Sequence, residues 1–155
     1  MIRLASVADV PRMVELSEQK RSEYERHQPI FWHQAMDAAE RQTTYFGRLI
    51  ARDDILVFVY EAGPAISGFI IGALMGAPPV FDPGGLTCMV DDFVVSDALD
   101  WRTVGGTLLH AVTDAAKQRG AVQVVAVCGR HDEPKRAMLA ANGCTVASEW
   151  WVGPI

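Results

Sequence analysis

A strand, a helix and a second strand in direct succession constrain the fold more than any other part of the chain. Leu86 to Val95 is rich in the branched and aromatic residues that strands favour, and Val122 to Val127 is an apolar run of strand length. Between them an apolar stripe at helical spacing, Val104 to Ala116, stops before Gly120, a typical helix end. Strands joined through a crossover helix pair in parallel. An unbroken apolar strand is typical of one covered on both faces.

Other segments predict antiparallel strands and further helices. Two short runs separated by E-A-G-P-A have the pattern of a β-hairpin. The predicted elements outside the central unit are a strand at Ile2 to Leu4, helices at Val7 to His27 and Phe31 to Ala51, hairpin strands at Ile55 to Tyr60 and Ile66 to Leu74, a helix from about Pro134 to Gly143, and a final strand or pair of strands at Cys144 to Val152. Together they predict an α/β fold with a mixed sheet. A chain of 155 residues, half of them apolar, can bury one sizeable core, so we expect a single domain spanning residues 1–155.

Composition and charge disfavour several classes of protein. The formal net charge is −5 and the Lys and Arg residues are scattered, which argues against a nucleic-acid partner. The longest apolar run, Ala65 to Pro79, is interrupted by glycines and a serine. It falls short of the roughly 18 uninterrupted residues of a membrane helix, so we expect no membrane partner. The first residues lack a secretory-signal pattern and the three cysteines are far apart, so we expect a cytoplasmic protein with reduced thiols.

The start of the predicted central helix has the features of a phosphate site. Backbone N–H groups in the first turn of a helix have no partner within the helix, and the helix dipole makes that end positive. Small residues let a phosphate approach these groups, and Gly105 and Gly106 meet this condition. With the strand before them and the amphipathic helix after them, they favour a nucleotide-bearing cofactor. The alternative is that the two glycines serve only a tight turn or close packing.

Two adjacent carboxylates, Asp91 and Asp92, lie near the end of the preceding strand. Successive side chains of a strand point to opposite faces, so at most one of the two can face a given cleft. Asp92 is expected to share its face with Val90 and Val94, and Asp91 is expected to share its face with Phe93. One of them is a candidate proton acceptor, and the alternative is an exposed edge feature without a catalytic role.

The element order, the motif V-D-D-F-V-V, the Gly-Gly helix start and the closing A-N-G-C resemble the GNAT acyltransferase superfamily over nearly the whole chain. Members of this superfamily move an acetyl group from acetyl-CoA to an amine. The resemblance implies a GNAT-like fold, with a mostly antiparallel sheet, a splayed parallel pair and about four flanking helices. It also implies acetyl-CoA (CoA) as cosubstrate. The pantetheine amides would pair like an added strand with Phe93, Val94 and Val95. The pyrophosphate would be held by the backbone N–H groups of Arg102, Thr103, Val104, Gly105, Gly106 and Thr107.

The pyrophosphate motif of the family, R/Q-x-x-G-x-G/A followed by a Leu pair, is matched in part. Registering Leu108–Leu109 on that pair puts Gly105 on the second glycine. Thr103 then takes the first glycine and Asp100 the basic position. We prefer this register. Starting the motif at Arg102 instead restores the basic residue and makes Gly105 the first glycine, but it shifts the helix.

A second family motif, N-x-x-A-x-x-L-Y-x-x-x-G-F, is anchored at Gly143 and changed elsewhere. The substituted positions are Asp132 for the Asn, Lys135 for the Ala, Met138 for the Leu, Leu139 for the Tyr and Cys144 for the Phe. In the family that Tyr commonly protonates the departing thiolate, and a leucine cannot donate a proton. Three alternatives stay open: the thiolate leaves unassisted, another donor such as His131 or Cys128 serves, or the protein binds CoA without efficient turnover.

The resemblance also implies catalytic roles for the strand that carries the two carboxylates. Acidic residues there often deprotonate the incoming ammonium through water, so Asp92, and after it Asp91, are the candidate catalytic residues. Backbone N–H groups near Val94 or Val95 would polarise the thioester oxygen.

The turn between the first two predicted helices covers the acceptor in the family. Tyr24 and Trp32 are therefore candidate substrate-binding residues, with a helix corner packed by large rings as the alternative. His27 and His33 lack a third ligand at fixed spacing, so no metal site is expected. One residue of the adjacent pair Trp150–Trp151 should point outward, which hints at a dimer surface or a lid over the acceptor pocket.

These patterns together predict an acetyltransferase. It would transfer an acetyl group from acetyl-CoA to a primary amine of an unidentified small-molecule or peptide acceptor, by direct attack in a ternary complex. One alternative is a CoA-binding regulatory module that keeps the fold and has lost the chemistry. Another is an unrelated mixed α/β interaction domain in which the two glycines serve packing only.

Overall fold

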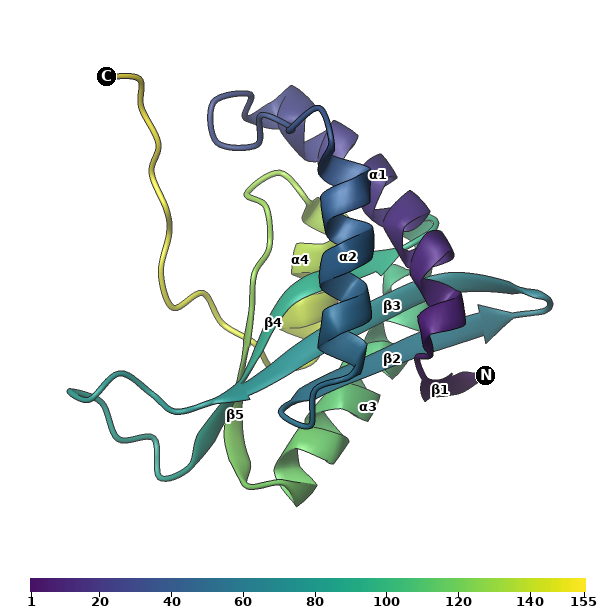
Figure 1. The fold of residues 1–155 in the computed structure, drawn as a ribbon. Coiled ribbons are helices and arrows are strands. Elements are labelled where there is room, and N and C mark those ends of the chain that lie inside the picture. The colour runs from purple at the N-terminus through teal and green to yellow at the C-terminus, as the bar shows by residue number, and fades with distance from the viewer.

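One five-stranded sheet organises the chain, which a computed structural model describes from residue 1 to residue 155. The strands follow one another across the sheet as β1 (Ile2–Leu4), β2 (Ile55–Ala62), β3 (Ala65–Met75), β4 (Leu86–Val95) and β5 (Ala121–Ala126). The first four pair antiparallel, and β4 pairs with β5 in parallel (Figure 1). The predicted mixed sheet with a parallel pair is therefore confirmed.

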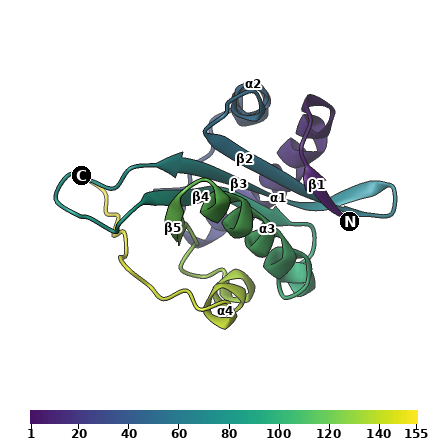
Figure 2. The same ribbon diagram turned by 90° about the horizontal axis from the view of Figure 1, so that it is seen from below.

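Helices cover both faces of this sheet (Figure 2). The helices on one face are α1 (Val10–His27) and α2 (Ala38–Ile50), and those on the other are α3 (Val104–Gln118) and α4 (Glu133–Ala141). Two short 3-10 helices, η1 (Val7–Asp9) and η2 (Ala98–Trp101), lead into α1 and α3. Each face has its own buried apolar core, with Phe46 and Phe69 edge to face at 5.6 Å on the first, and Leu108 and Val112 on the second.

Three predictions about the elements are wrong. The second helix begins at Ala38 rather than Phe31, because the chain after α1 first makes turns, closed by bonds such as Trp32 N–H to Gln28 O at 3.0 Å. Residues 144–152 form no strand, since no other strand of this chain pairs with them. The last strand, β5, is not covered on both faces, because Val122 is 54% exposed and Val125 is 38% exposed.

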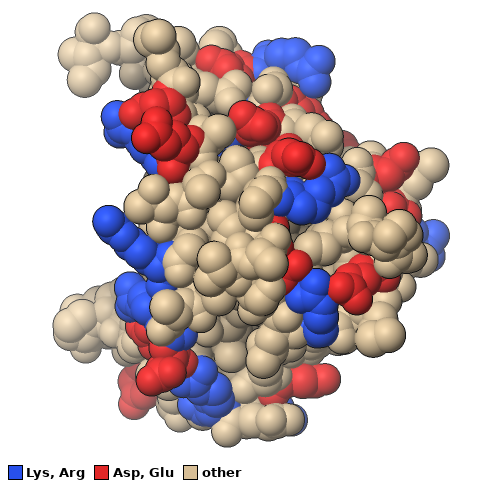
Figure 3. All heavy atoms as spheres, turned by 45° about the vertical axis from the view of Figure 1, so that its right-hand side comes forward, with Lys and Arg blue, Asp and Glu red and all other residues tan.

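The surface carries charges of both signs. On the face seen in Figure 3, Lys and Arg side chains are interspersed with Asp and Glu side chains. The negative net charge is therefore not gathered into one patch on that face. No helix combines the length and apolar character that a crossing of the bilayer requires.

The start of α3 packs tightly on the 3-10 helix before it. Trp101 is fully buried, and a Cβ atom on Gly105 would lie 2.6 Å from its Cε3 atom, so only glycine fits at this position. A Cβ atom on Gly106 would meet no atom closer than Asn142 Nδ2 at 3.9 Å. Gly105 thus serves packing, whereas Gly106, although buried, has room for an added methyl group.

We expect opposite effects from an added methyl group at the two glycines. Gly105→Ala should lower the free energy of unfolding by about 1–3 kcal/mol, because the methyl group collides with the Trp101 ring. Gly106→Ala should be neutral or stabilise by up to about 1 kcal/mol, because alanine favours a helix and has room. Urea unfolding of both variants measures the difference, and equal effects would contradict it.

Candidate functional site

A pocket of about 360 Å³ opens between α1, the turn after it, the second half of β4 and α4. It brings together residues that the sequence singled out separately, namely Asp91, Asp92, Phe93, Val94, Tyr24 and Trp32. Lys20, Arg21 and Lys135 line it as well, although none of the three was among the predicted site residues. The predicted catalytic and substrate-binding residues thus share one cavity.

A β-bulge in β4 sets the directions of the side chains in this pocket. Ile70 pairs with Phe93, but Gly72 pairs with Val90, so β4 carries one extra residue at Asp91–Asp92. Val90 and Phe93 therefore lie in the same core beneath α3, whereas Val94 lies in the core beneath α1 and α2. The regular alternation predicted from the sequence, with Val90 on the face of Val94, is wrong because the bulge interrupts it.

Beyond the bulge, β4 has an open edge. Its pairing with β5 ends where Val90 meets Ala126, and β4 continues to Val95 without a strand on that side. Ser96 donates its N–H to Ser67 O of the neighbouring chain segment at 2.7 Å, so this residue faces β3. In an antiparallel pair the direction of the backbone groups alternates, which turns those of Val94 toward β3 and those of Phe93 and Val95 toward the open edge.

Asp92 is a half-buried carboxyl group beside this edge. Burial raises its pKa to about 6, and the neighbouring charge of Asp91 adds to the rise, while Lys135 and Arg21 oppose it. A carboxylate whose pKa lies near neutrality can take up a proton from a substrate and pass it on. The electrostatics of the pocket therefore suit Asp92 to act as a general base.

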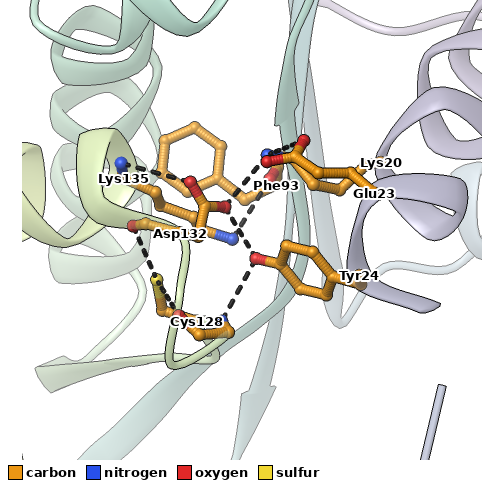
Figure 4. Close-up of polar contacts among 8 residues, drawn as sticks. Lys20, Glu23, Tyr24, Phe93, Cys128, Asp132 and Lys135 are labelled. Atoms are coloured by element: carbon orange, nitrogen blue, oxygen red, sulfur yellow. Dashed lines mark hydrogen bonds and ion pairs between the residues drawn. The ribbon is translucent and has the colours of Figure 1, made fainter. Parts of the chain in front are cut away.

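Lys135 of α4 fills part of the space next to the open edge (Figure 4). It is only 3% exposed, and its Nζ donates a hydrogen bond to Phe93 O at 3.1 Å. The ammonium group lies 5.3 Å from the ring centre of Phe93 and 5.4 Å from that of Trp101. Burial lowers the pKa of Lys135, because the charged form loses its hydration.

Asp132 ties α1 to the start of α4 (Figure 4). Its Oδ2 accepts hydrogen bonds from Lys20 Nζ at 3.0 Å and from the Tyr24 hydroxyl at 2.7 Å. Its Oδ1 accepts a longer one from the Lys135 backbone N–H, as expected of a helix N-cap. The Tyr24 oxygen in turn accepts from Gly129 N–H at 3.1 Å, and burial raises the pKa of Tyr24. Tyr24 is thus a half-buried link between two walls of the pocket.

Aromatic rings and one arginine complete the acceptor side. The ring centres of Tyr24 and Trp32 are 5.1 Å apart, and Trp32 meets Phe31 edge to face at 4.6 Å. Arg21 donates a hydrogen bond from Nη1 to Gln42 Oε1, while its Nε and Nη2 have no acceptor in the protein. The pocket therefore offers an apolar wall and unused N–H donors next to the carboxylate.

The start of α3 can receive a phosphate, although acidic residues lie near it. Thr103 is the N-cap, and its carbonyl accepts the N–H of Thr107 at 3.0 Å, so the first-turn amides precede that bond. Gly105 and Gly106 are buried here, whereas Arg102, Thr103 and Thr107 are exposed around them. Asp100 lies in the preceding 3-10 helix. The predicted pyrophosphate residues thus gather at one helix end, where the exposed ones, Arg102, Thr103 and Thr107, could contact a phosphate.

The pantetheine part of CoA fits this chain only if Lys135 moves. Phe93 O, which the resemblance assigns to a pantetheine amide, already accepts a hydrogen bond from Lys135 Nζ. A lysine has four rotatable side-chain bonds and its ammonium is better hydrated outside the protein, so the side chain can withdraw. The open edge of β4 can therefore pair with pantetheine once Lys135 Nζ no longer occupies Phe93 O.

Leu139 and the two candidate proton donors, Cys128 and His131, lie in different surroundings. Leu139 is buried in the core of the α3 face, as an apolar residue in that position would be. Cys128 lies beside the Asp132 cluster, and burial raises the pKa of its thiol (Figure 4). His131 stacks on His27 with ring centres 5.1 Å apart. Of these, Cys128 contacts the Asp132 backbone, with its Sγ 3.9 Å from Asp132 O.

The likeness of the chain to known proteins is one of fold. No protein-family model matches it, and no curated protein matches it in sequence. A tetramutant of the BH1408 protein from Bacillus halodurans superposes with a TM-score of 0.86 at 14% identity, covering 100% of this chain and 99% of that one.

Two acetyltransferase structures are similar to the chain as well. A predicted acetyltransferase from Clostridium acetobutylicum, crystallised with acetyl-CoA, has a TM-score of 0.77 at 15% identity and covers 99% of this chain and 95% of its own. Glucosamine-6-phosphate N-acetyltransferase from Arabidopsis thaliana has a TM-score of 0.69 at 16% identity, with 99% and 97% covered. The fold is therefore that of the GNAT acetyltransferases, as the resemblance implied.

Replacing Asp92 by asparagine should stabilise the protein in a pH-dependent way. The pKa of Asp92 is raised by folding to about 6 from an ordinary value of 3.8, so the folded state loses stability as the pH rises through this range and the carboxyl group ionises. Asp92→Asn should raise the free energy of unfolding by about 2–3 kcal/mol near pH 8 and have little effect near pH 4.

Urea unfolding of both proteins at the two pH values measures this difference. Asp91→Asn is the matched control, because loss of its charge should lower the pKa of Asp92 and shift the midpoint of the effect to lower pH. A stabilisation by Asp92→Asn that is the same at both pH values would contradict the burial of an ionisable carboxyl group.

Proposed function

We propose that the protein is an N-acetyltransferase that acetylates a primary amine with acetyl-CoA and uses Asp92 as its base. One observation carries the proposal. A half-buried carboxyl group with a pKa of about 6 lines the same pocket as an unpaired strand edge. The fold supports it, since similar structures include acetyltransferases, one of them containing acetyl-CoA.

One part of the pocket would deprotonate the acceptor, and another would bind the cosubstrate. Acetyl-CoA would supply the activated acyl group and a thiol leaving group. Asp92 would take a proton from the acceptor ammonium, directly or through a water molecule, so that the free amine can attack. The backbone groups of Phe93 and Val95 on the open edge would pair with the pantetheine, and the first turn of α3 at Gly106 would hold the pyrophosphate.

The acceptor side favours an amine with an apolar part and a nearby oxygen. Trp32 offers a ring face next to Tyr24, against which an apolar group can pack. The unpartnered Nε and Nη2 of Arg21 would donate to a carbonyl or carboxylate oxygen of the acceptor. Asp92 would face the amine itself. Holding the amine close to the thioester then adds to the effect of deprotonation.

A thiol-release assay tests the proposal directly. Wild-type protein is expected to release CoA from acetyl-CoA in the presence of some member of a panel of polyamines, amino acids, aminoglycosides and peptides. Asp92→Asn should lower kcat by roughly 10²–10⁴-fold, the usual contribution of a positioned base, whereas Asp91→Asn should have a smaller effect. Unchanged activity in Asp92→Asn would show that Asp92 is not the general base.

Binding of CoA to Lys135 variants tests the proposed pantetheine edge. Lys135→Ala should tighten CoA binding by roughly tenfold, because it frees both Phe93 O and the space beside it. Lys135→Met is the matched control, since it frees the carbonyl oxygen but keeps a side chain in the space. Calorimetry measures both affinities. Equal affinity in all three proteins would mean that CoA does not use this edge.

A second candidate function is a CoA-binding module without efficient turnover. It is favoured by Leu139, which is buried in the core where the family carries its proton donor. CoA binding by calorimetry together with no thiol release across the amine panel would support this candidate over the enzyme.

A further inference from the structure

Arg21 of α1 carries two unused hydrogen-bond donors at the pocket, which it lines together with Trp32 and Asp92. Its Nη1 donates to Gln42 Oε1, whereas its Nε and Nη2 are shielded from solvent and have no acceptor. Arg21 also takes no part in the ion pairs of the chain. Burying part of a charged guanidinium group without an anion or full hydrogen bonding is unfavourable. Arg21 therefore lacks a partner that the chain itself does not supply.

The two free nitrogens form an edge of the guanidinium group that binds carboxylates. The Nε–H and one Nη2–H point in parallel, at a spacing that matches the two oxygens of a carboxylate. Arg52 shows this pairing elsewhere in the chain, because its Nε donates to Asp54 Oδ1 at 2.9 Å and its Nη2 to Asp54 Oδ2 at 2.6 Å. A carbonyl oxygen carries no net charge, so it would leave the charge of Arg21 uncompensated. A carboxylate is therefore the better match for the free edge of Arg21.

The other two cations that line the pocket are already engaged. Lys20 forms ion pairs with two carboxylates, at 3.0 and 3.3 Å. Lys135 donates to Phe93 O and lies over two aromatic rings, on the strand edge proposed for the cosubstrate. Arg21 is therefore the cation that remains for an anionic group on the acceptor.

Asp92 lies near Arg21 without pairing with it. Burial and the charge of Asp91 raise the pKa of Asp92, and the charges of Lys135 and Arg21 oppose this rise. The charges of Arg21 and Asp92 therefore interact through space, although no ion pair joins them. The pocket thus presents one cationic group and one anionic group to the same ligand.

We propose that the acceptor is a small zwitterion, a free amino acid with an apolar side chain, and that Arg21 binds its carboxylate. In this arrangement the amine faces Asp92 and the apolar side chain packs on the ring of Trp32. Because Nε and Nη2 are shielded from solvent, the ligand displaces a neighbouring side chain of the pocket wall to reach them. The inference rests on the proposed function for the transfer step and on Arg21 for the choice of ligand.

The size of the pocket agrees with a small acceptor. Ligand sites in proteins occupy roughly 300–1,000 Å³. The pocket measures about 360 Å³, near the lower end of that range. This volume favours a free amino acid over an aminoglycoside or a long peptide.

Calorimetry with matched ligands tests the choice of ligand without any turnover. The probes are L-leucine, L-methionine and L-phenylalanine, each compared with its α-amide and with the amine that lacks the carboxyl group, with and without CoA. Wild-type protein is expected to bind at least one amino acid roughly tenfold or more tightly than its amide, which keeps the amine and a carbonyl but loses the negative charge. Equal affinity for acid and amide would overturn the inference, as would failure of all three amino acids to bind under both conditions.

Arginine variants assign the carboxylate contact. Arg21→Gln should weaken amino-acid binding by roughly tenfold or more and leave amide binding unchanged. Arg21→Lys keeps the charge but not the paired donors, so it should recover only part of the affinity. Arg26→Gln is the matched control, because it removes the same charge from an exposed position of the same helix, and it should change neither affinity. A preference for the acid that survives both Arg21 substitutions would contradict the assignment.

The stability of the free protein separates a ligand-binding role of Arg21 from a structural one. Arg21→Gln should not lower the melting temperature without ligand, because it removes shielded donors that have no partner. The amino acid should raise the melting temperature of the wild type and not that of this variant. A lower melting temperature of the free variant, with unchanged amino-acid binding, would mean that Arg21 serves the fold instead.

The thiol-release assay distinguishes this inference from the proposed function. Faster CoA release with the amino acids than with their amides, lost in Arg21→Gln, supports both. Amino-acid binding without any thiol release would uphold the choice of ligand and reject the acetyltransferase. Release that is equally fast with the amides or the simple amines would uphold the acetyltransferase and overturn the zwitterionic acceptor.

Discussion

The site depends on the separation of β4 from β5 after Val90. A strand that loses its neighbour leaves backbone groups that must find other partners. Part of that need is met by Lys135, which donates to Phe93 O, and the rest of the edge remains available to a ligand. The bulge at Asp91–Asp92 lies at the same point and sets which carboxylate turns toward the buried side of the pocket. The end of the β4–β5 pairing thus leaves the edge of β4 open, and the bulge at the same point sets the direction of the Asp92 side chain.

Buried charge is the second feature that organises this region. Asp132 is buried but has Lys20 and Tyr24 as partners, so its charge is compensated. Lys135 has no carboxylate partner and relies on a carbonyl oxygen and two aromatic rings. A buried ammonium without an anion is unfavourable, and so is the nearby Asp92 carboxylate. The pocket therefore holds charges that a bound acceptor or cosubstrate could relieve, which is a common property of reactive sites.

Prediction from sequence succeeded where a pattern depends on neighbours along the chain. The helical stripe of α3 and the hairpin of β2 and β3 are such patterns, and the structure contains both. The burial of Lys135 could not be predicted, although its position in the family motif was visible, because its surroundings come from β4 and the 3-10 helix before α3. The bulge was missed as well, because two consecutive acidic residues fit a regular strand equally well.

The sequence by itself determined the order of the elements as far as α4, the mixed pairing of the sheet and the family that the fold resembles. These follow from hydrophobic spacing and from turn and cap residues, which act over a few positions. Only the tertiary structure decided that Asp92 is half-buried with a raised pKa, that Lys135 lies on the open edge of β4, and that Gly105 packs on Trp101. Each of these depends on segments distant in sequence, because burial and electrostatic surroundings are properties of the assembled chain and not of any one segment.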